Sequence, residues 1–268
     1  MAFPLLLYAE LLAYRRPLGQ RGRLGQTAAI MPKFHPAPGR LPAGRRLYAI
    51  GDVHGCDRQL AELHALVADD LKRRPTPLAT LVHIGDYVDR GPDSAAVVRR
   101  IMQGAPAKGL AVINLMGNHE RTMLDALGGQ KAAATDWLFS GGRPALESWG
   151  IDPESPPATW AEAIPAEEQR FLRKLDLCHH EGDYFFAHAG VRPGVALHEQ
   201  TPEDLMRIRH AFLGSETDHG AIIIHGHTPV RQGPEVYANR INIDTGAVFG
   251  RELTLLILEG DQLAFEQA

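Results

Sequence analysis

Residues 85–91, GDYVDRG, place two aspartates, a tyrosine and an arginine between two glycines. They follow directly on the apolar run Leu81–Ile84, which predicts a buried strand. Charge at the end of such a strand needs a partner, because a carboxylate taken out of water without compensation is costly. This stretch therefore predicts a sheet whose strand end holds a cation.

The same pattern, polar residues directly after an apolar run, recurs at four other places along the chain. The motifs and their polar residues are AIGDVHG with Asp52 and His54, LMGNHE with Asn118 and His119, FFAHAG with His188, and IIIHGHTP with His225 and His227. In open α/β sheets, ligands gather outside the carboxyl ends of the strands. We therefore expect these side chains to meet at one site.

The residue types at these strand ends indicate metal ions. Carboxylate, imidazole and amide ligands without a thiolate suit divalent manganese, iron, zinc or cobalt. They outnumber the ligands that one tetrahedral ion needs. Two ions about 3.5–4 Å apart would use them, and would clamp the attacking and leaving oxygens of a phosphoryl displacement.

The order of predicted elements indicates an α/β fold. Strands are expected at 47–50, 81–84 and 110–116, helices at 60–71, 95–102 and 119–127, and a later group of strands at 184–187, 221–224, 240–243 and 253–258. Strands that alternate with helices predict βαβ units, and the later group predicts a second sheet facing the first. Between them, residues 128–180 are rich in Gly, Pro and Trp and predict a small helical insertion.

Residues 1–45 differ from the rest and are expected to be a basic, proline-rich N-terminal extension ahead of a catalytic domain at 46–268. Residues 1–50 hold eight Lys or Arg and a single acid. A helix over Leu5–Leu12 is expected to dock on the domain. Two alternatives stay open, an organelle transit peptide and a true start at Met31.

Composition excludes several classes of function. The formal net charge is −4 and the basic excess lies in the first 50 residues, so the acidic remainder argues against a general nucleic-acid binder. The apolar stretch near the start is too short to span a bilayer, which argues against a membrane protein. Two cysteines without paired spacing indicate a reducing compartment. We therefore expect a soluble, cytoplasmic protein.

The motifs GDVHG, GDYVDRG, GNHE, AHAG and GHTP, in this order, resemble the phosphoprotein phosphatase branch of the calcineurin-like metallophosphoesterases, bacterial type, over roughly residues 46–260. The resemblance implies a four-layer αββα sandwich of two mixed sheets. It also implies a serine/threonine protein phosphatase that hydrolyses phosphoserine and phosphothreonine in proteins or peptides.

The resemblance further implies a dinuclear metal centre. Its expected ligands are Asp52, His54 and Asp86 for one ion, and Asp86, Asn118, His188 and His227 for the other. A hydroxide bridging the two ions would be the nucleophile. Manganese is the expected metal, with iron or zinc as alternatives.

By the same resemblance, His119 would protonate the leaving oxygen and Asp89 would orient it. Arg90, Asn118 and a second arginine would bind the phosphate. Two residues compete for that second role, Arg207 and Arg209, and we select Arg209.

Other polar residues are expected to have structural roles. Glu120 would tether a loop, and His225 would pack beside the site. The remaining candidates are His83, expected in the core, and His179 and His180, expected in a solvated loop. The tryptophans of the insertion are expected to form its core.

Two alternative functions remain. Symmetrical diadenosine tetraphosphatases share the superfamily, but tend to read GDLVARG and GNHD where this chain has Asp89 and Glu120. A non-catalytic phosphate-binding scaffold should lack a metal ligand or the acid, and here every expected position is filled. The residues that would choose between peptide and dinucleotide fall in the insertion.

Overall fold

A six-stranded mixed sheet forms one half of the structure. The computed structural model describes residues 31–268, so the helix expected over Leu5–Leu12 lies outside the described residues. The strands lie in the order β1 (His35–Pro36), β11 (Gln262–Gln267), β10 (Thr254–Glu259), β2 (Arg45–Ile50), β3 (Leu78–His83) and β4 (Leu110–Asn114). Strands β2, β3 and β4 are parallel, and the other pairs are antiparallel.

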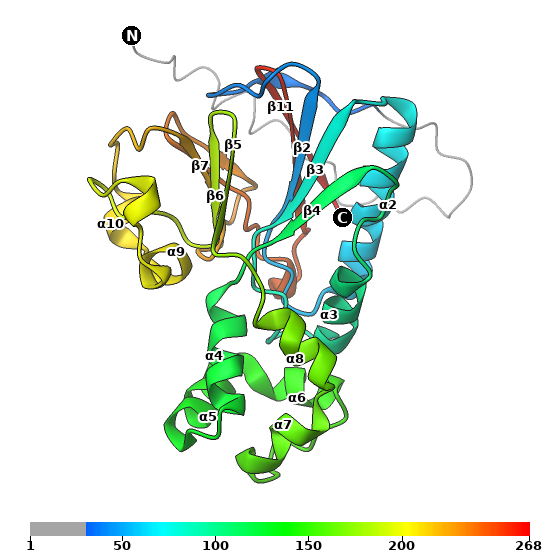
Figure 1. Ribbon diagram of the computed structural model, residues 1–268, viewed down its shortest axis with the longest axis vertical. Helices are drawn as coiled ribbons and strands as arrows, with labels where there is room; N and C mark the ends of the chain where they lie inside the picture. The colour runs from blue at the N-terminus through cyan, green and yellow to red at the C-terminus, as the bar shows by residue number, and fades with distance from the viewer. Residues whose placement is uncertain (1–30) are drawn as a thin grey trace.

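A second, five-stranded sheet faces the first (Figure 1). Its order is β5 (Cys178–Glu181), β6 (Tyr184–Ala187), β7 (Ile222–His225), β9 (Arg240–Asn242) and β8 (Glu235–Val236). Strands β6, β7 and β9 are parallel, whereas β5 and β8 run antiparallel to their neighbours. Both sheets are therefore mixed, as the family resemblance implied.

Alternation along β2 explains how the first sheet buries both of its faces. Leu47 and Ala49 belong to the apolar cluster between the two sheets, whereas Tyr48 and Ile50 belong to the cluster on the opposite face. Successive side chains of a strand point to opposite faces, so a strand covered on both sides reads as a continuous apolar run.

Helices cover the outer face of each sheet. Helices α2 (Asp57–Arg73) and α3 (Ser94–Met102) lie on the first sheet, and α9 (Pro202–Arg207) and α10 (His210–Leu213) lie on the second (Figure 1). The buried Leu60, Leu63 and Val67 of α2 follow the predicted helical spacing. The four-layer αββα sandwich expected from the sequence is confirmed.

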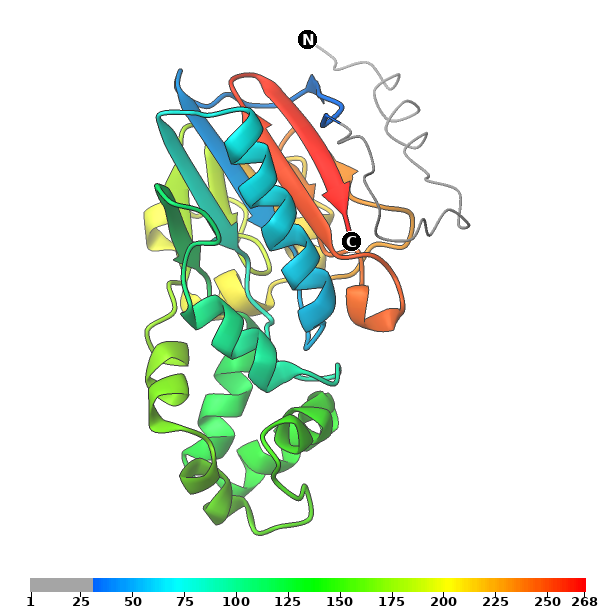
Figure 2. The same ribbon diagram turned by 90° about the vertical axis from the view of Figure 1, so that its right-hand side faces the viewer.

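A helical lobe, residues 118–172, projects from the end of the sandwich (Figures 1 and 2). It consists of α4 (Asn118–Leu127), α5 (Lys131–Trp137), the π-helical turn η1 (Leu138–Gly142), α6 (Arg143–Ser148), η2 (Pro157–Thr159), α7 (Trp160–Ala163) and α8 (Ala166–Leu172). Trp137 and Trp160 are fully buried in it, with ring centroids 5.6 Å apart. Two short 3-10 turns, η3 (Leu197–Glu199) and η4 (Ala247–Phe249), complete the described elements.

The structure corrects several local expectations. His179 and His180 lie in β5 and pair with β6 rather than in a solvated loop, because the turn at 182–183 makes a hairpin. Within the predicted extension, β1 pairs with β11 and so joins the first sheet. Among residues 31–268, no helix is long and apolar enough to cross a membrane.

Candidate metal centre

Two groups of potential metal ligands share one carboxylate at the strand ends. The first group, here the His54 group, contains His54, Asp86 and His119, and the second, the His227 group, contains Asp86, His188 and His227. Within each group the candidate ligand atoms lie within 4.8 Å of one another, and all these residues are buried. A shared carboxylate between two such groups is the arrangement that bridges two ions.

Asp86 is held rigidly at the end of β3. Its backbone N–H donates to Glu120 Oε2 at 2.9 Å, and its Oδ1 accepts the His119 backbone N–H at 3.1 Å. His188 Nε2 lies 3.3 Å from Oδ1, and His54 Nε2 lies 3.4 Å from Oδ2. Burial opposes ionisation, but the His188 and His119 charges hold the pKa of Asp86 well below its usual value. The carboxylate is therefore ionised and available to cations.

Hydrogen bonds on the far side of two imidazoles orient them toward Asp86. His54 Nδ1 lies 2.8 Å from the Val88 carbonyl oxygen, and His188 Nδ1 lies 3.0 Å from the Ile84 carbonyl oxygen. A carbonyl only accepts, so each Nδ1 carries a hydrogen, and in the neutral ring each Nε2 presents a lone pair. Such partners typically fix the tautomer of a metal-ligating histidine.

His227 supplies a direct test of whether the site fits a metal. Its Nε2 accepts a hydrogen bond from Arg209 Nε at 3.0 Å, whereas its buried Nδ1 has no hydrogen-bond partner among the described residues. The Asn118 Oδ1 atom lies 3.1 Å from His188 Nε2, which adds an amide oxygen to the same space. With Nε2 accepting, a neutral ring carries its hydrogen on Nδ1, so a cation on Nδ1 would require that hydrogen to move to Nε2 and replace the Arg209 contact. The donor set of two imidazoles, a carboxylate and an amide oxygen suits a divalent cation.

Asp52, after β2, completes the acidic part of the centre. Its Oδ2 accepts the His227 backbone N–H at 3.0 Å. Burial, followed by the charges of Asp244 and Asp86, raises the pKa of Asp52 well above its usual value. A cation placed here would offset this repulsion and favour the ionised carboxylate.

Within the His54 group, His119 forms a buried pair with Asp89. His119 Nδ1 lies 2.7 Å from Asp89 Oδ2, and Trp137 donates its indole N–H to Asp89 Oδ1 at 2.8 Å. Burial lowers the pKa of His119, but Asp86 and Asp89 outweigh burial and raise it. His119 is therefore oriented as a proton donor.

Two exposed arginines flank the centre, one at each ligand group. Arg90 Nη1 lies 2.8 Å from His54 Nε2, and its backbone N–H donates to the Gly141 carbonyl at 2.9 Å. Arg209 contacts His227, as described above. Guanidinium groups so placed can bind the oxygens of a phosphate.

Backbone conformation also marks this site. Among residues 31–268, every non-glycine residue with positive φ belongs to the predicted site, namely His54, Asp86, Asp89, Arg90 and His227. Such conformations cost free energy and persist where the surroundings impose them, frequently at functional sites. At two glycines the backbone lies directly against a carboxylate of the site. A Cβ on Gly117 would overlap Asp86 Oδ1, and one on Gly226 would overlap Asp52 Oδ1.

The contacts described above connect the residues that the sequence assigned to the site. However, Asp52 belongs to neither ligand group, and His119, expected as the acid, belongs to the His54 group. Glu120 accepts from the backbone of Asp86, Tyr87, Val88 and Gly117, in agreement with its expected tethering role. His225 packs on Phe212, with ring centroids 4.9 Å apart, and belongs to neither ligand group.

Sequence reasoning missed the contact between Trp137 and Asp89. The available signal was the pair Gly141-Gly142 shortly after Trp137. A Cβ on Gly142 would overlap the Trp137 ring, and Gly141 contacts Arg90.

Comparison with known proteins finds relatives of two enzymatic types. The chain is 31% identical over 224 residues to serine/threonine-protein phosphatase 1 of Salmonella typhimurium, covering 79% of this chain and 91% of the relative. It is 29% identical over 233 residues to the asymmetrical bis(5'-nucleosyl)-tetraphosphatase PrpE of Bacillus velezensis, covering 76% and 86%. It is 30% identical over 204 residues to the symmetrical bis(5'-nucleosyl)-tetraphosphatase of Nitrosomonas europaea, covering 74% and 66%.

Structural comparison supports the fold. A cold-active protein tyrosine phosphatase superposes with a TM-score of 0.56 at 19% identity, covering 85% of this chain and 81% of the other. The family model described as calcineurin-like phosphoesterase matches residues 45–257, which include every residue of the two ligand groups. Members of this family use a dinuclear metal centre, and the donor set described above fits one. The chain belongs to the calcineurin-like phosphoesterase family and is a hydrolase of that family.

Proposed function

We propose that this protein is a manganese-dependent, cytoplasmic serine/threonine phosphatase that hydrolyses phosphomonoesters of serine and threonine in proteins. The single observation that carries the proposal is the buried pair of His119 and Asp89, with 2.7 Å between Nδ1 and Oδ2. The relatives support phosphate ester or anhydride hydrolysis but include both substrate types.

Residues of the two ligand groups, together with Asp52 and Asn118, would hold the metal ions. His54, Asp86 and Asp52 would bind one ion, and Asp86, Asn118, His188 and His227 would bind the other, with iron or zinc as alternatives to manganese. Bound ions would supply an activated water nucleophile and neutralise phosphate charge. The exposed guanidinium groups of Arg90 and Arg209 would orient the phosphate oxygens, and the Asn118 amide would assist them.

The leaving group explains why the His119 pair favours a phosphomonoester. A serine or threonine alkoxide is a strong base and a poor leaving group, so its departure needs a proton. A nucleotide phosphate is a weak base and leaves without one. With its Nδ1 hydrogen directed to Asp89, His119 can deliver the proton on Nε2 to the departing oxygen. A buried proton donor that is paired with a carboxylate is therefore suited to an alkoxide leaving group.

A dinucleoside tetraphosphatase is the alternative function, because the relatives of Bacillus velezensis and Nitrosomonas europaea carry that name at nearly the same identity. In this reading Arg90 and Arg209 would bind successive phosphates of the chain. The protonating pair would then contribute little to the rate.

A direct competition between substrates tests the proposal. The manganese-reconstituted protein is assayed for phosphate release from a phosphothreonine peptide and, under the same conditions, for nucleotides released from diadenosine tetraphosphate. A higher kcat/KM on the peptide is expected. Higher activity on the dinucleotide would overturn the proposal, and its products would identify the cut, since two ADP indicate symmetrical and ATP with AMP asymmetrical cleavage.

A further inference from the structure

A polar groove between the helical lobe and α9 contains none of the residues of the two ligand groups. Its volume is about 530 Å³, and its lining residues are Thr122, Asp125, Ala133, Asp136, Phe139, Ser140 and Arg207. On α4, Thr122 and Asp125 are three positions apart, and on α5 and η1 the spacing from Ala133 to Asp136 to Ser140 is also helical. Residues at such spacing share one helix face, so two polar helix faces form the opposite walls.

The groove is joined to the metal centre through the chain. Thr122 donates its hydroxyl to the Asn118 carbonyl at 2.8 Å, one turn before it on α4. Arg207 precedes Arg209 by two positions. On the opposite wall, Asp136 precedes the Trp137 that holds Asp89, and Ser140 precedes the Gly141 that holds Arg90. Because residues one turn apart share a helix face, the Thr122 wall of the groove lies next to Asn118 of the centre, where the part of a substrate beyond its phosphate would lie.

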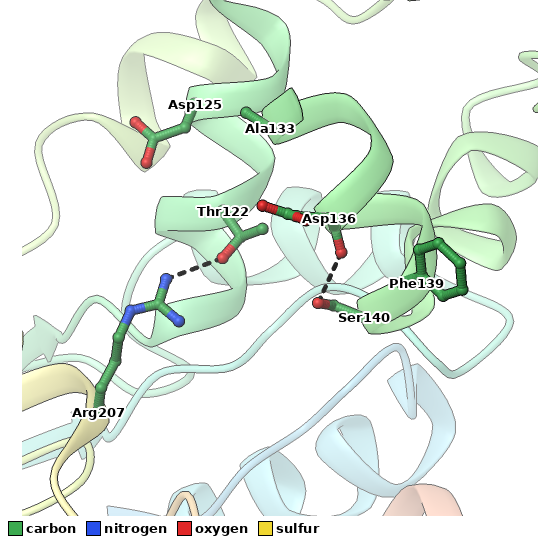
Figure 3. A pocket seen from close by; sticks show the side chains of 7 residues that line it. All are labelled: Thr122, Asp125, Ala133, Asp136, Phe139, Ser140 and Arg207. Atoms are coloured by element: carbon green, nitrogen blue, oxygen red, sulfur yellow. Dashed lines mark hydrogen bonds between the residues drawn. The ribbon is translucent and has the colours of Figure 1, made fainter. Parts of the chain in front are cut away.

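The charges in the groove leave one carboxylate uncompensated. Asp125 pairs with Arg121 at 3.2 Å, and Arg207 pairs with Glu203 at 3.6 Å while it donates to Thr122 at 3.0 Å. In contrast, the Asp136 carboxylate has no hydrogen-bond or ion-pair partner within residues 31–268. Figure 3 shows it directed across the groove toward Thr122, with Arg207 reaching Thr122 from the other side.

We propose that this groove binds the segment of a phosphopeptide substrate that flanks the phosphorylated residue, and that Asp136 selects a lysine or arginine in that segment. The inference rests on the proposed protein phosphatase function. It deepens that function by naming the substrate class, basic phosphopeptides. A second nucleotide with its phosphates is the wrong occupant, because the unpaired charge of the groove is negative.

The test is a set of phosphothreonine peptides that differ by lysine, alanine or glutamate at each flanking position. The protein is expected to hydrolyse the peptide with lysine at one of these positions with a kcat/KM about two- to fivefold above alanine, the range of an exposed ion pair. The preference should shrink at high salt, because exposed charges are screened.

Substitutions at Asp136 test whether this residue causes the lysine preference. Asp136→Asn should remove the lysine preference, and Asp136→Lys should invert it in favour of glutamate. The ratio of two kcat/KM values within one variant does not depend on the fraction of folded protein. Glu167→Gln, at an exposed position on α8 outside the groove, removes the same charge from the lobe and should keep the preference.

The outcomes separate the two proposals. Hydrolysis of peptides without a lysine preference, or with a preference that survives in Asp136→Asn, overturns the groove assignment and leaves the phosphatase function intact. Failure to hydrolyse any peptide, with turnover of diadenosine tetraphosphate, overturns both. A preference lost equally in Glu167→Gln would show a general effect of lobe charge and would also overturn the role of Asp136.

Discussion

Trp137 donates its indole N–H to Asp89 Oδ1 at 2.8 Å, so a residue of the helical lobe holds a carboxylate of the loop after β3. The other oxygen of that carboxylate contacts His119. The orientation of the expected proton donor therefore depends on the folding of the lobe as well as on the sheet.

Replacing Trp137 by Phe should impair both stability and turnover. The change keeps an aromatic ring but leaves a buried carboxylate oxygen unsatisfied, which costs about 1–3 kcal/mol in the free energy of unfolding. It also frees Asp89 to rotate away from His119, so kcat on a phosphothreonine peptide should fall. Urea unfolding and steady-state kinetics measure the two effects.

The matched control is Trp149→Phe. Trp149 donates to Glu168 Oε2 at 2.5 Å in the same lobe, away from the ligand groups. This variant should lose stability but keep kcat. Equal kcat in Trp137→Phe and the wild type would contradict the role of Trp137 in orienting the acid.

Two substitutions in the centre should separate metal binding from proton transfer. Asp86→Asn should abolish turnover and weaken loading of both ions, because Asp86 is shared by both ligand groups. His119→Asn should keep the metals but reduce kcat by about 10²–10⁴-fold on a phosphothreonine peptide, the usual contribution of a general acid.

Elemental analysis of the purified variants, alongside kinetics, checks this prediction. The loss in His119→Asn should be much smaller on p-nitrophenyl phosphate, whose leaving group needs no proton. A uniform loss across both esters would contradict the assignment of His119 as the acid.

Gly226→Ala should lower metal binding although Gly226 is not a ligand. The new Cβ would overlap Asp52 Oδ1 and displace the carboxylate. Titration with manganese should show weakened binding at one of the two sites. Gly214→Ala is the control, because its Cβ would lie 3.3 Å from the nearest atom, the His210 carbonyl oxygen. Manganese binding in Gly226→Ala equal to that of the wild type would contradict the predicted overlap with Asp52.

Acid should destabilise the protein through a buried histidine pair that belongs to neither ligand group. His64 Nε2 and His83 Nε2 are 2.9 Å apart. Burial, then the Arg100 charge, lowers the pKa of His64 to about 4, and burial, then His64, lowers the pKa of His83 to about 3. The unfolded values are about 6.5, so the unfolded chain binds more protons below pH 6.5 and stability falls as the pH drops.

The variant His64→Gln should remove part of this acid sensitivity. Keeping one such histidine neutral costs about 2 kcal/mol at pH 5. Between pH 7.5 and pH 5, the variant should therefore lose about 2 kcal/mol less of its free energy of unfolding than the wild type. Urea unfolding across this range measures the difference, with the exposed His198→Gln as the control. If the free energy of unfolding fell equally with pH in the wild type, His64→Gln and His198→Gln, the role of His64 in acid sensitivity would be refuted.

The fold was predictable from sequence where the signal was local. Buried parallel strands such as β2 and β3 read as short apolar runs, and the polar residues after them marked the shared edge of the sheet. The expected metal ligands followed from this arrangement, because ligand type and strand-end position are both visible in the sequence.

What the sequence did not predict depends on pairing between strands. Strands β1 and β8 have two residues each, too few for any periodicity to identify them, and the partner of β1 is β11, more than 200 residues along the chain. His179 and His180 are polar, yet they lie in an edge strand where hydrogen bonding to β6 decides the conformation. The groove walls carry polar residues at helical spacing, which resembles an ordinary solvated helix face.

The position of β10 between β2 and β11 has a consequence for biosynthesis. Strand β2 is made early and pairs with β3 on one side, but its other neighbour is β10, at residues 254–259. While the ribosome makes the intervening chain, that side of β2 has no strand partner. An open strand edge invites pairing with other chains. We expect the nascent protein to depend on chaperones until β10 emerges.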